Sequence, residues 1–341
     1  MSSALSGEGI GGQSDSKGRM NFFADLPCPM KQRFRDAYEA FETQYFKETG
    51  QRFYSVLLSL NPDPEEKTMT VQDIKSAKTI DDIPDMVICY ALDVFSRRDF
   101  IEKYIRPGCF EKALDTEGLN FINRNEFDDP CRSFNSIGFF PQIVLVDKKQ
   151  LGNRPVPASL ESLMDPVYEK SIVIPSLETD DISTMLLHHI YQNYGEAGLD
   201  KIEKNIRGSM ESADAVTIAG QGKSGAAVYL VPWVFAQEAA GREHTEIVWP
   251  SEGALAEPMV LMIKKDRPKK TDALLNFLLS PEVSQMFAEN FFISADPGAD
   301  TRIPAGGKIK WLGWNYIYNN DITAIQKMLT ERFNKFLHIC E

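Results

Sequence analysis

Apolar and polar positions follow two alternating patterns along the first third of the chain. Short runs that are apolar throughout predict strands, and the first run spans Met20 to Ala24. An apolar stripe at spacings of three and four predicts the helix that follows, which is expected to end at Gly50. Further strands are expected at 53–60 and 85–91, and further helices at 70–77 and 96–105. Apolar strands that alternate with helices are typical of a mainly parallel sheet covered on both faces.

The same alternation continues to the C-terminus. Strands are expected at 140–151, at the end of 156–175, and as a pair within 246–266. Helices are expected at 176–198, at 271–290 with a break at Pro281, and at 321–339. The pattern therefore predicts an α/β protein, and 341 residues are more typical of two lobes or domains than of one.

Composition narrows the function classes. A net charge of −12 leaves no cationic surplus to replace phosphate counterions, which argues against sequence-independent nucleic-acid binding. No apolar run is long enough for a transmembrane helix, so the chain is not expected to be embedded in a membrane. The five cysteines are scattered and form no C-x-x-C pair, so neither a disulfide framework nor a zinc knuckle is expected. We expect a reduced, monomeric protein.

The first 19 residues are rich in serine and glycine and hold no apolar core of the kind a secretory signal needs. They predict a disordered leader. As the sequence stands, the protein would be cytoplasmic; if a signal has been removed, it would be periplasmic or extracellular.

A glycine-rich stretch, Gly220 to Gly225, contains the Gly-Lys-Ser that ends a phosphate-binding P-loop. The P-loop pattern requires a glycine five residues before Gly222, where this chain has Thr217. The segment is also followed by a strand-like run ending at Pro232, whereas a P-loop opens a long helix. Two interpretations remain: a solvated turn, or a loop whose glycines allow close backbone approach to a ligand.

Two longer segments carry a family resemblance. The first is "PASLESLMDPVYEKSIVIP", residues 157–175. The second, residues 249–287, runs from "WPSEGALAEPMVLMI" to "SPEVSQMF". In this order they resemble the type II solute-binding proteins of ABC importers, with the ferric-iron, thiamine and polyamine branch nearest in style. The resemblance covers residues 20 to about 340.

The resemblance implies an α/β fold of two lobes, with two mixed, mainly parallel sheets joined by a two-strand hinge. The first lobe would hold 20–140 and 255–341, and the second 141–254. The crossovers would lie near 138–142 and 250–256.

For function, the resemblance implies capture of a small solute in the interlobe cleft by hinge closure, without catalysis and without a cofactor. The ligand class stays open between a metal ion, an oxyanion and a small organic anion. An ABC permease would be the partner if the protein is exported. The alternatives are a transferase-like enzyme or a cytoplasmic solute sensor on the same fold.

Ligands of open parallel sheets bind beside the C-terminal ends of strands. Under this rule and the resemblance, the candidate ligand-binding residues are Asp25, Cys28, Ser96, Asn135, Thr179, Lys223, Ser224, Tyr229, Trp249 and Glu252.

Several candidates also have ordinary structural interpretations. Cys28 could be a small buried apolar side chain, and Glu252 could stabilise its turn. Ferric members of the resembled branch use two adjacent tyrosines, whereas Tyr229 is followed by leucine and valine. His188 and His189 are adjacent on a predicted helix and point about 100° apart, so they are not expected to chelate one ion together. The sequence does not identify any metal ligands.

Overall fold

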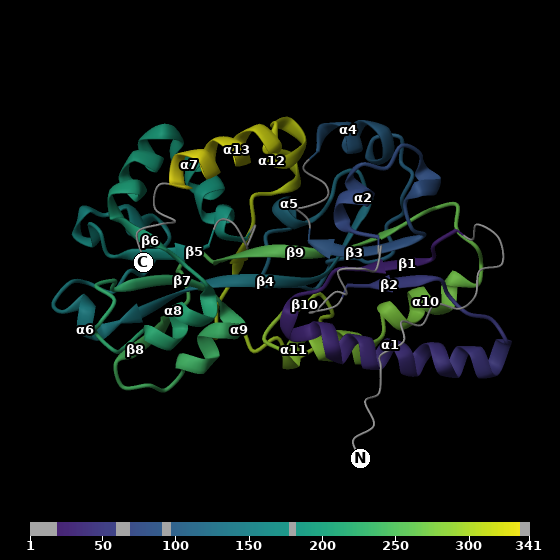
Figure 1. Ribbon diagram of the computed structural model, residues 1–341, viewed down its shortest axis with the longest axis horizontal. Coiled ribbons are helices and arrows are strands. Elements are labelled where there is room, and N and C mark those ends of the chain that lie inside the picture. Colours follow the sequence, from purple (N-terminus) through teal and green to yellow (C-terminus); the bar gives the residue numbers. More distant parts are fainter. Residues whose placement is uncertain (1–18, 59–68, 91–96, 177–181, 335–341) are drawn as a thin grey trace, which may run out of the picture.

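The structure is a computed structural model, and it describes residues 19–58, 69–90, 97–176 and 182–334. Within these ranges the chain forms a mixed α/β fold with helices on both faces of a sheet (Figure 1). The α/β class expected from the apolar pattern is confirmed. Ser96, Thr179 and the expected leader lie outside the described residues.

The strands in the described part of the chain all join one sheet of eleven strands. They are β1 (Phe22–Ala24), β2 (Ser55–Leu57), β3 (Met86–Tyr90), β4 (Phe134–Asp147), β5 (Ile172–Pro175), β6 (Ile206–Met210), β7 (Val228–Pro232), β8 (Thr245–Val248), β9 (Ala254–Ile263), β10 (Ile293–Ser294) and β11 (Ile309–Lys310).

Helices connect most of these strands. They are α1 (Cys28–Thr49), α2 (Val71–Lys75), α4 (Arg98–Phe100), α5 (Arg124–Phe127), α6 (Lys148–Leu151), α7 (Ile182–Asn205), α8 (Ser212–Ile218), α9 (Trp233–Ala236), α10 (Thr271–Leu278), α11 (Pro281–Glu289), α12 (Trp314–Asn319) and α13 (Ile322–Phe333). A π-helical turn, Ile101–Ile105, continues α4.

Local sequence signals explain several helix ends. Thr70 and Asp73 form a reciprocal capping box at α2, as a threonine cap predicts. Gly50 ends α1 in the left-handed conformation, which glycine adopts without steric penalty. The predicted break at Pro281 is confirmed, because α10 ends at Leu278 and Ser280 caps α11. The helix end expected near Gly195 is confirmed, because the backbone of Gly195 is non-helical (φ 61°, ψ −155°) and divides α7 into two helical segments, the second of which ends at Asn205.

The sheet runs in the order β2-β1-β3-β9-β4-β7-β5-β6. Strands β1, β2 and β3 pair in parallel in one half, and β5, β6 and β7 pair in parallel in the other. Only β4 and β9 belong to both halves of the described sheet, and they pair antiparallel from Phe134 to Gln142. The two halves are connected by two strands, as the resemblance implies, but the hydrogen-bonded ladder is continuous through them, so the two expected sheets are joined into one.

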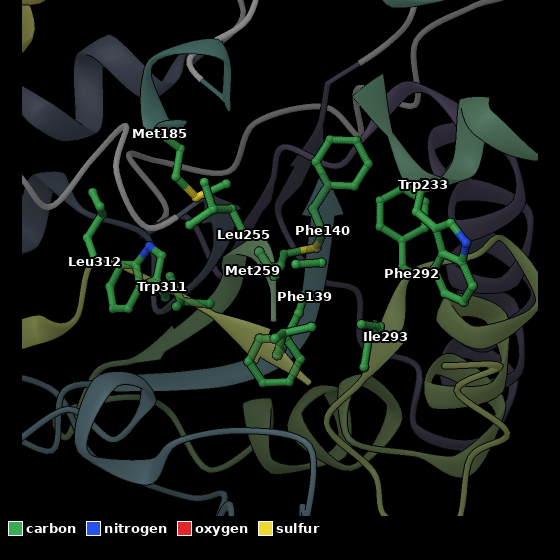
Figure 2. Packing of buried hydrophobic residues seen from close by; sticks show 14 of the residues in the cluster. Phe139, Phe140, Met185, Trp233, Leu255, Met259, Phe292, Ile293, Trp311 and Leu312 are labelled. Atoms are coloured by element: carbon green, nitrogen blue, oxygen red, sulfur yellow. The ribbon is translucent and has the colours of Figure 1, made fainter. Parts of the chain in front are cut away.

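The stretch where the two halves meet, called the joint below, consists of Gly138–Gln142 of β4 and the paired Leu255–Met259 of β9. Its two faces carry separate aromatic clusters. On one face, the Phe139 ring lies edge-on against Phe127, with centroids 5.1 Å apart. On the other, Phe140 stacks on Phe292 at 4.9 Å. Figure 2 shows Phe139, Phe140 and Phe292 around the two strands. Side-chain alternation along β4 places its neighbouring phenylalanines in different layers.

The C-terminal segment contacts both halves. Trp314 of α12 stacks on Phe134 at a centroid distance of 4.5 Å and donates its indole N–H to the carbonyl of Phe127. Arg332 of α13 instead forms ion pairs with three acidic residues of α7: Glu196, Asp200 and Glu203. The division into lobes at 140 and 255 stays a prediction, and α13 packs against a helix of the other half.

Candidate functional site

The C-terminal ends of strands from both halves converge on the joint. Tyr90, the last residue of β3, pairs with Met259, which in turn pairs with Gly138. On the other half, Pro232 ends β7 opposite Gln142. Strand β1 is parallel to β3, and β5 is parallel to β7, so the C-terminal ends of β1 and β5 also point towards the joint, from opposite sides. The chain segments that follow these strand ends therefore lie where an open α/β sheet binds its ligand.

The segment after β1 brings two sequence-predicted residues to this edge. The carboxylate of Asp25 pairs with the ammonium of Lys31 at 3.3 Å, and both side chains are partly buried. Cys28 is the first residue of α1 and is exposed. The first turn of α1 has no side-chain cap and no acidic residue. A helix start of this kind favours negative charge nearby.

The sequence did not point to the polar side chains inside the joint. Gln142 of β4 and Glu257 of β9 are each 1% exposed. Phe140 pairs with Glu257 and Gln142 lies two residues further on, so these side chains share one face of the sheet. Tyr90 reaches the same face, with its ring 6.1 Å from that of Phe140. A glutamate and a glutamine within apolar strands are the signal that could have identified them, because buried polar side chains need a specific reason.

Asn135 is buried and fully committed to the fold. Its amide oxygen accepts from the backbone N–H groups of Ala113 and Leu114, at 2.6 and 3.0 Å. Its amide nitrogen donates to the carbonyls of Glu111 and Leu261, both at 3.0 Å. The side chain thus fastens an extended segment to β4 and β9.

The glycine-rich stretch lies at the far end of β4 and β7 from the joint, because Val228 pairs with Val146 while Pro232 pairs with Gln142. The N–H groups of Gly220 and Gly222 donate to one carboxylate oxygen of Asp147, at 2.9 and 3.1 Å. In a P-loop such N–H groups hold a phosphate. Here a buried side chain of the protein itself takes the place of that anion.

The remaining residues of this stretch are also structural or solvated. Lys223 is exposed. The hydroxyl of Ser224 is hydrogen-bonded to that of Tyr229, whose ring is fully buried on β7. A shallow pocket of about 330 Å³ lies beside the loop, lined by Thr217, Ala219, Gly220, Gln221, Arg242, Glu243 and His244.

Trp249 and Glu252 occupy the link between β8 and β9. The carboxylate of Glu252 accepts from the backbone N–H of Leu160 at 2.6 Å, which favours a turn-stabilising role. Trp249 donates its indole N–H to the carbonyl of Lys308 at 2.7 Å. Both side chains therefore fasten the link to neighbouring segments.

Eight of the ten predicted ligand residues are described. Asp25 and Cys28 follow the end of β1, and Trp249 contacts Trp233 at the end of β7, with ring centroids 5.2 Å apart. Lys223, Ser224 and Tyr229 are instead towards the far end of β7 from the joint.

The adjacent histidines of α7 have separate surroundings, as their helical spacing predicts. His188 is buried and hydrogen-bonded through Nε2 to the amide oxygen of Gln326, at 2.8 Å. Burial lowers the pKa of His188 to about 4. Burial, reinforced by the charge of Lys310, likewise lowers the pKa of His189 to about 4. Both side chains are neutral at pH 7.

Two kinds of feature are absent from the described residues. No group of three or more histidine, cysteine, aspartate or glutamate side chains there is arranged to hold a metal ion. None of the described helices combines the length and apolar character that a membrane span requires.

The fold is that of type II periplasmic binding proteins, as comparison with solved structures shows. An iron- and citrate-bound Trichodesmium protein, IdiA or FutA, is 15% identical, with a TM-score of 0.63 over 93% of this chain and 99% of that one. The apo ferric ion-binding protein A of Pasteurella haemolytica is 15% identical, with a TM-score of 0.61 over 94% and 98%. An ABC transporter protein of Clostridium perfringens is 14% identical, with a TM-score of 0.62 over 94% and 100%.

Sequence comparison narrows the class to a family. The sulfate-binding protein of Salmonella typhimurium is 37% identical over 76 residues, which are 20% of this chain and only 23% of that protein. The model of the bacterial extracellular solute-binding proteins matches residues 81–320, and the chain belongs to this family. The expected class is confirmed: the protein binds a small solute and is not an enzyme. Membership also implies a periplasmic or extracellular location.

Proposed function

We propose that the protein captures a small solute at the joint, by closure of the two halves of the sheet about β4 and β9, and delivers it to an ABC permease. The observation that carries this proposal is the convergence of strand ends from both halves on a connection of two strands. A connection this narrow allows the halves to rotate as bodies around a ligand. A monomer exported from the cytoplasm fits this function.

The preferred ligand is a small oxyanion. The uncapped first turn of α1 follows the C-terminal end of β1, and helix N-termini favour anions. Lys31, held beside Asp25, adds a cation to the same edge. The similarity to a sulfate-binding protein, although limited to 76 residues, supports the same class. The iron- and citrate-bound structural neighbour is only 15% identical, so the similarity to it supports the shared fold and not iron as the ligand.

The proposed ligand contacts are Cys28, Lys31 and Tyr90, together with Ser96 and Thr179, which follow β3 and β5 in the sequence and lie outside the described residues. Asp25 positions Lys31 through their ion pair. Asn135, Ser224, Tyr229, Trp249 and Glu252 act in the fold through the contacts described above.

The charge of the ligand can be tested with two variants of one ion pair. We would measure binding of sulfate, phosphate and ferric citrate by calorimetry, after a native mass spectrum of the purified protein has identified any retained ligand. For an anion, Lys31→Gln should weaken binding about tenfold or more, because it removes a partly buried charge worth ~1.4 kcal/mol or more. Lys223→Ala, at the far end of β7, is the matched control and should bind as wild type.

The opposite pattern would contradict the anion assignment. If Asp25→Asn abolishes binding of ferric citrate while Lys31→Gln does not weaken it, the ligand is a cation. If Lys223→Ala alone abolishes binding, the site is at the glycine-rich stretch and not at the joint. Chemical conversion of the retained ligand would refute the binding function itself.

A further inference from the structure

Two strands from different halves meet end to end beside the joint. On one edge of β4, β7 pairs with residues up to Gln142, and β10 pairs with Phe139 and Gly138. Since both strands run antiparallel to β4, β10 continues the line of β7 after a gap opposite Phe140 and Pro141. The residues that flank this gap, Trp233 after β7 and Phe291 shortly before β10, therefore face each other across the boundary between the halves.

These two side chains form the centre of a continuous stack. The Trp233 ring is edge-on to Phe291, with centroids 5.5 Å apart and planes at 83°. The guanidinium of Arg302 lies 5.0 Å from the centroid of the same Phe291 ring. Edge-to-face and cation–π contacts of this kind are attractive and depend on geometry. We call Trp233, Phe291 and Arg302 the aromatic latch.

The latch is anchored on its outer side as well. Trp249, in the link from β8 to β9, lies edge-on to Trp233 at 5.2 Å. Its indole N–H is fixed by the carbonyl of Lys308. Figure 2 shows Trp233 on the same side of the strands as Phe292, whose ring stacks on Phe140 of the joint. A change in the angle between the halves must therefore move the rings of the latch.

The backbone is strained where the latch is held. Phe291 has a φ of 59° and Arg302 a φ of 52°, in the left-handed region that bulky side chains rarely adopt. Within the described residues, only two other non-glycine residues, Arg132 and Lys170, have a positive φ. Such strain persists when surrounding contacts over-determine it, and it is concentrated at switches and clamps. Phe291 and Arg302 are two strained residues in contact with each other, and Phe291 also contacts Trp233 across the boundary between the halves.

We propose that the aromatic latch sets the balance between the arrangement of the two halves seen here and the alternative arrangement in the solute-binding cycle. The proposal rests on the proposed function for its role in affinity. The latch stabilises the present arrangement through Trp233 and Phe291, while the left-handed backbone at Phe291 and Arg302 opposes it. An apparent dissociation constant varies inversely with the population of the binding-competent arrangement, so the latch tunes affinity without touching the ligand.

The test measures the arrangement directly and needs no ligand. Spin labels at Lys47→Cys and Lys201→Cys, in a chain whose native cysteines are replaced by alanine, report the distance between α1 and α7 by double electron–electron resonance. Both positions are exposed and lie on helices of opposite halves. Trp233→Ala and Phe291→Ala should each change the ratio of the two distance populations by at least about threefold. Arg302→Gln should change it in the same direction and less.

The controls separate loss of the latch from loss of stability. Trp233→Phe keeps an aromatic ring and should keep the wild-type distribution. Phe53→Ala removes a buried ring that stacks on Phe41 of α1, far from the joint. It should lower the melting temperature and leave the distribution of spin-label distances unchanged. A wild-type distribution in both Trp233→Ala and Phe291→Ala would overturn the proposal. Failure to bind sulfate, phosphate or ferric citrate would instead count against the proposed function.

Discussion

The carboxylate of Asp147 allows the sharpest test of the glycine-rich stretch. The residue is fully buried, and four backbone N–H groups converge on it. One oxygen accepts from Lys149 and Gln150 at 2.9 and 3.1 Å, which caps α6. The other accepts from Gly220 and Gly222 at 2.9 and 3.1 Å. The side chain therefore ties the end of β4 to a loop some 75 residues away.

The expected loss of stability follows from these donors. Leaving one buried N–H without an acceptor costs about 1–3 kcal/mol. In Asp147→Ala all four lose their acceptor, but water can reach the partly exposed loop, so we expect the free energy of unfolding to fall by about 4 kcal/mol. Asp147→Asn keeps one acceptor oxygen and two of the bonds, so about 2 kcal/mol should be lost.

Urea unfolding followed by circular dichroism would measure both losses. Hydrogen exchange of the peptide around Gly220 and Gly222 would show whether this loop opens. The matched control is Asp165→Ala, which removes an exposed cap that accepts from the single N–H of Val167 and should cost no more than about 1 kcal/mol. Equal stability of Asp147→Ala and Asp165→Ala, or unchanged exchange at the loop, would refute the reasoning.

Three further predictions concern the rest of the fold. Arg332→Ala should lower the free energy of unfolding by about 1 kcal/mol, because two of its three acidic partners are exposed, and the difference should shrink in 1 M salt when melting curves are compared. Trp314→Ala should cost about 3–5 kcal/mol in urea titrations, since it empties a buried site stacked on Phe134; a loss below 1 kcal/mol would contradict the packing. The pKa of His188 is about 4 when folded and 6.5 when exposed, so between these values the unfolded chain binds more protons, and stability should fall as the pH drops from 6.5 towards 4. His188→Gln should flatten that slope, and an unchanged slope in denaturation midpoints would show that other groups cause it.

Much of the fold was predictable because its signals are local. The apolar runs of β1, β3 and β5 and the apolar stripe of α1 depend on periodicity alone, and each was predicted near its observed place. The threonine cap of α2 and the break at Pro281 are set by backbone chemistry within four residues. The order of the two motif-bearing segments, 157–175 and 249–287, was enough to predict a type II solute-binding protein.

Elements shaped by distant partners were less predictable. Strand β4 begins at Phe134, six residues before the start of the strand expected at 140–151. That segment is a strand because β9 pairs with it, and its own sequence, with serine, asparagine and glycine, is a weak strand signal. The continuous sheet follows from the same pairing.

The candidate site shows the same division. Sequence alone determined the α/β class, the strand ends and the residues that follow them, because these depend on neighbours along the chain. The tertiary structure alone decided that the N–H groups of Gly220 and Gly222 bind Asp147, about 75 residues away, and that Trp233 contacts Phe291 across the joint. It also decided that the amide of Asn135 bonds two other segments, residues 111–114 and β9. A hydrogen-bond donor or an aromatic ring carries no record in its local sequence of which distant partner will satisfy it, since that choice is made by strand register and packing.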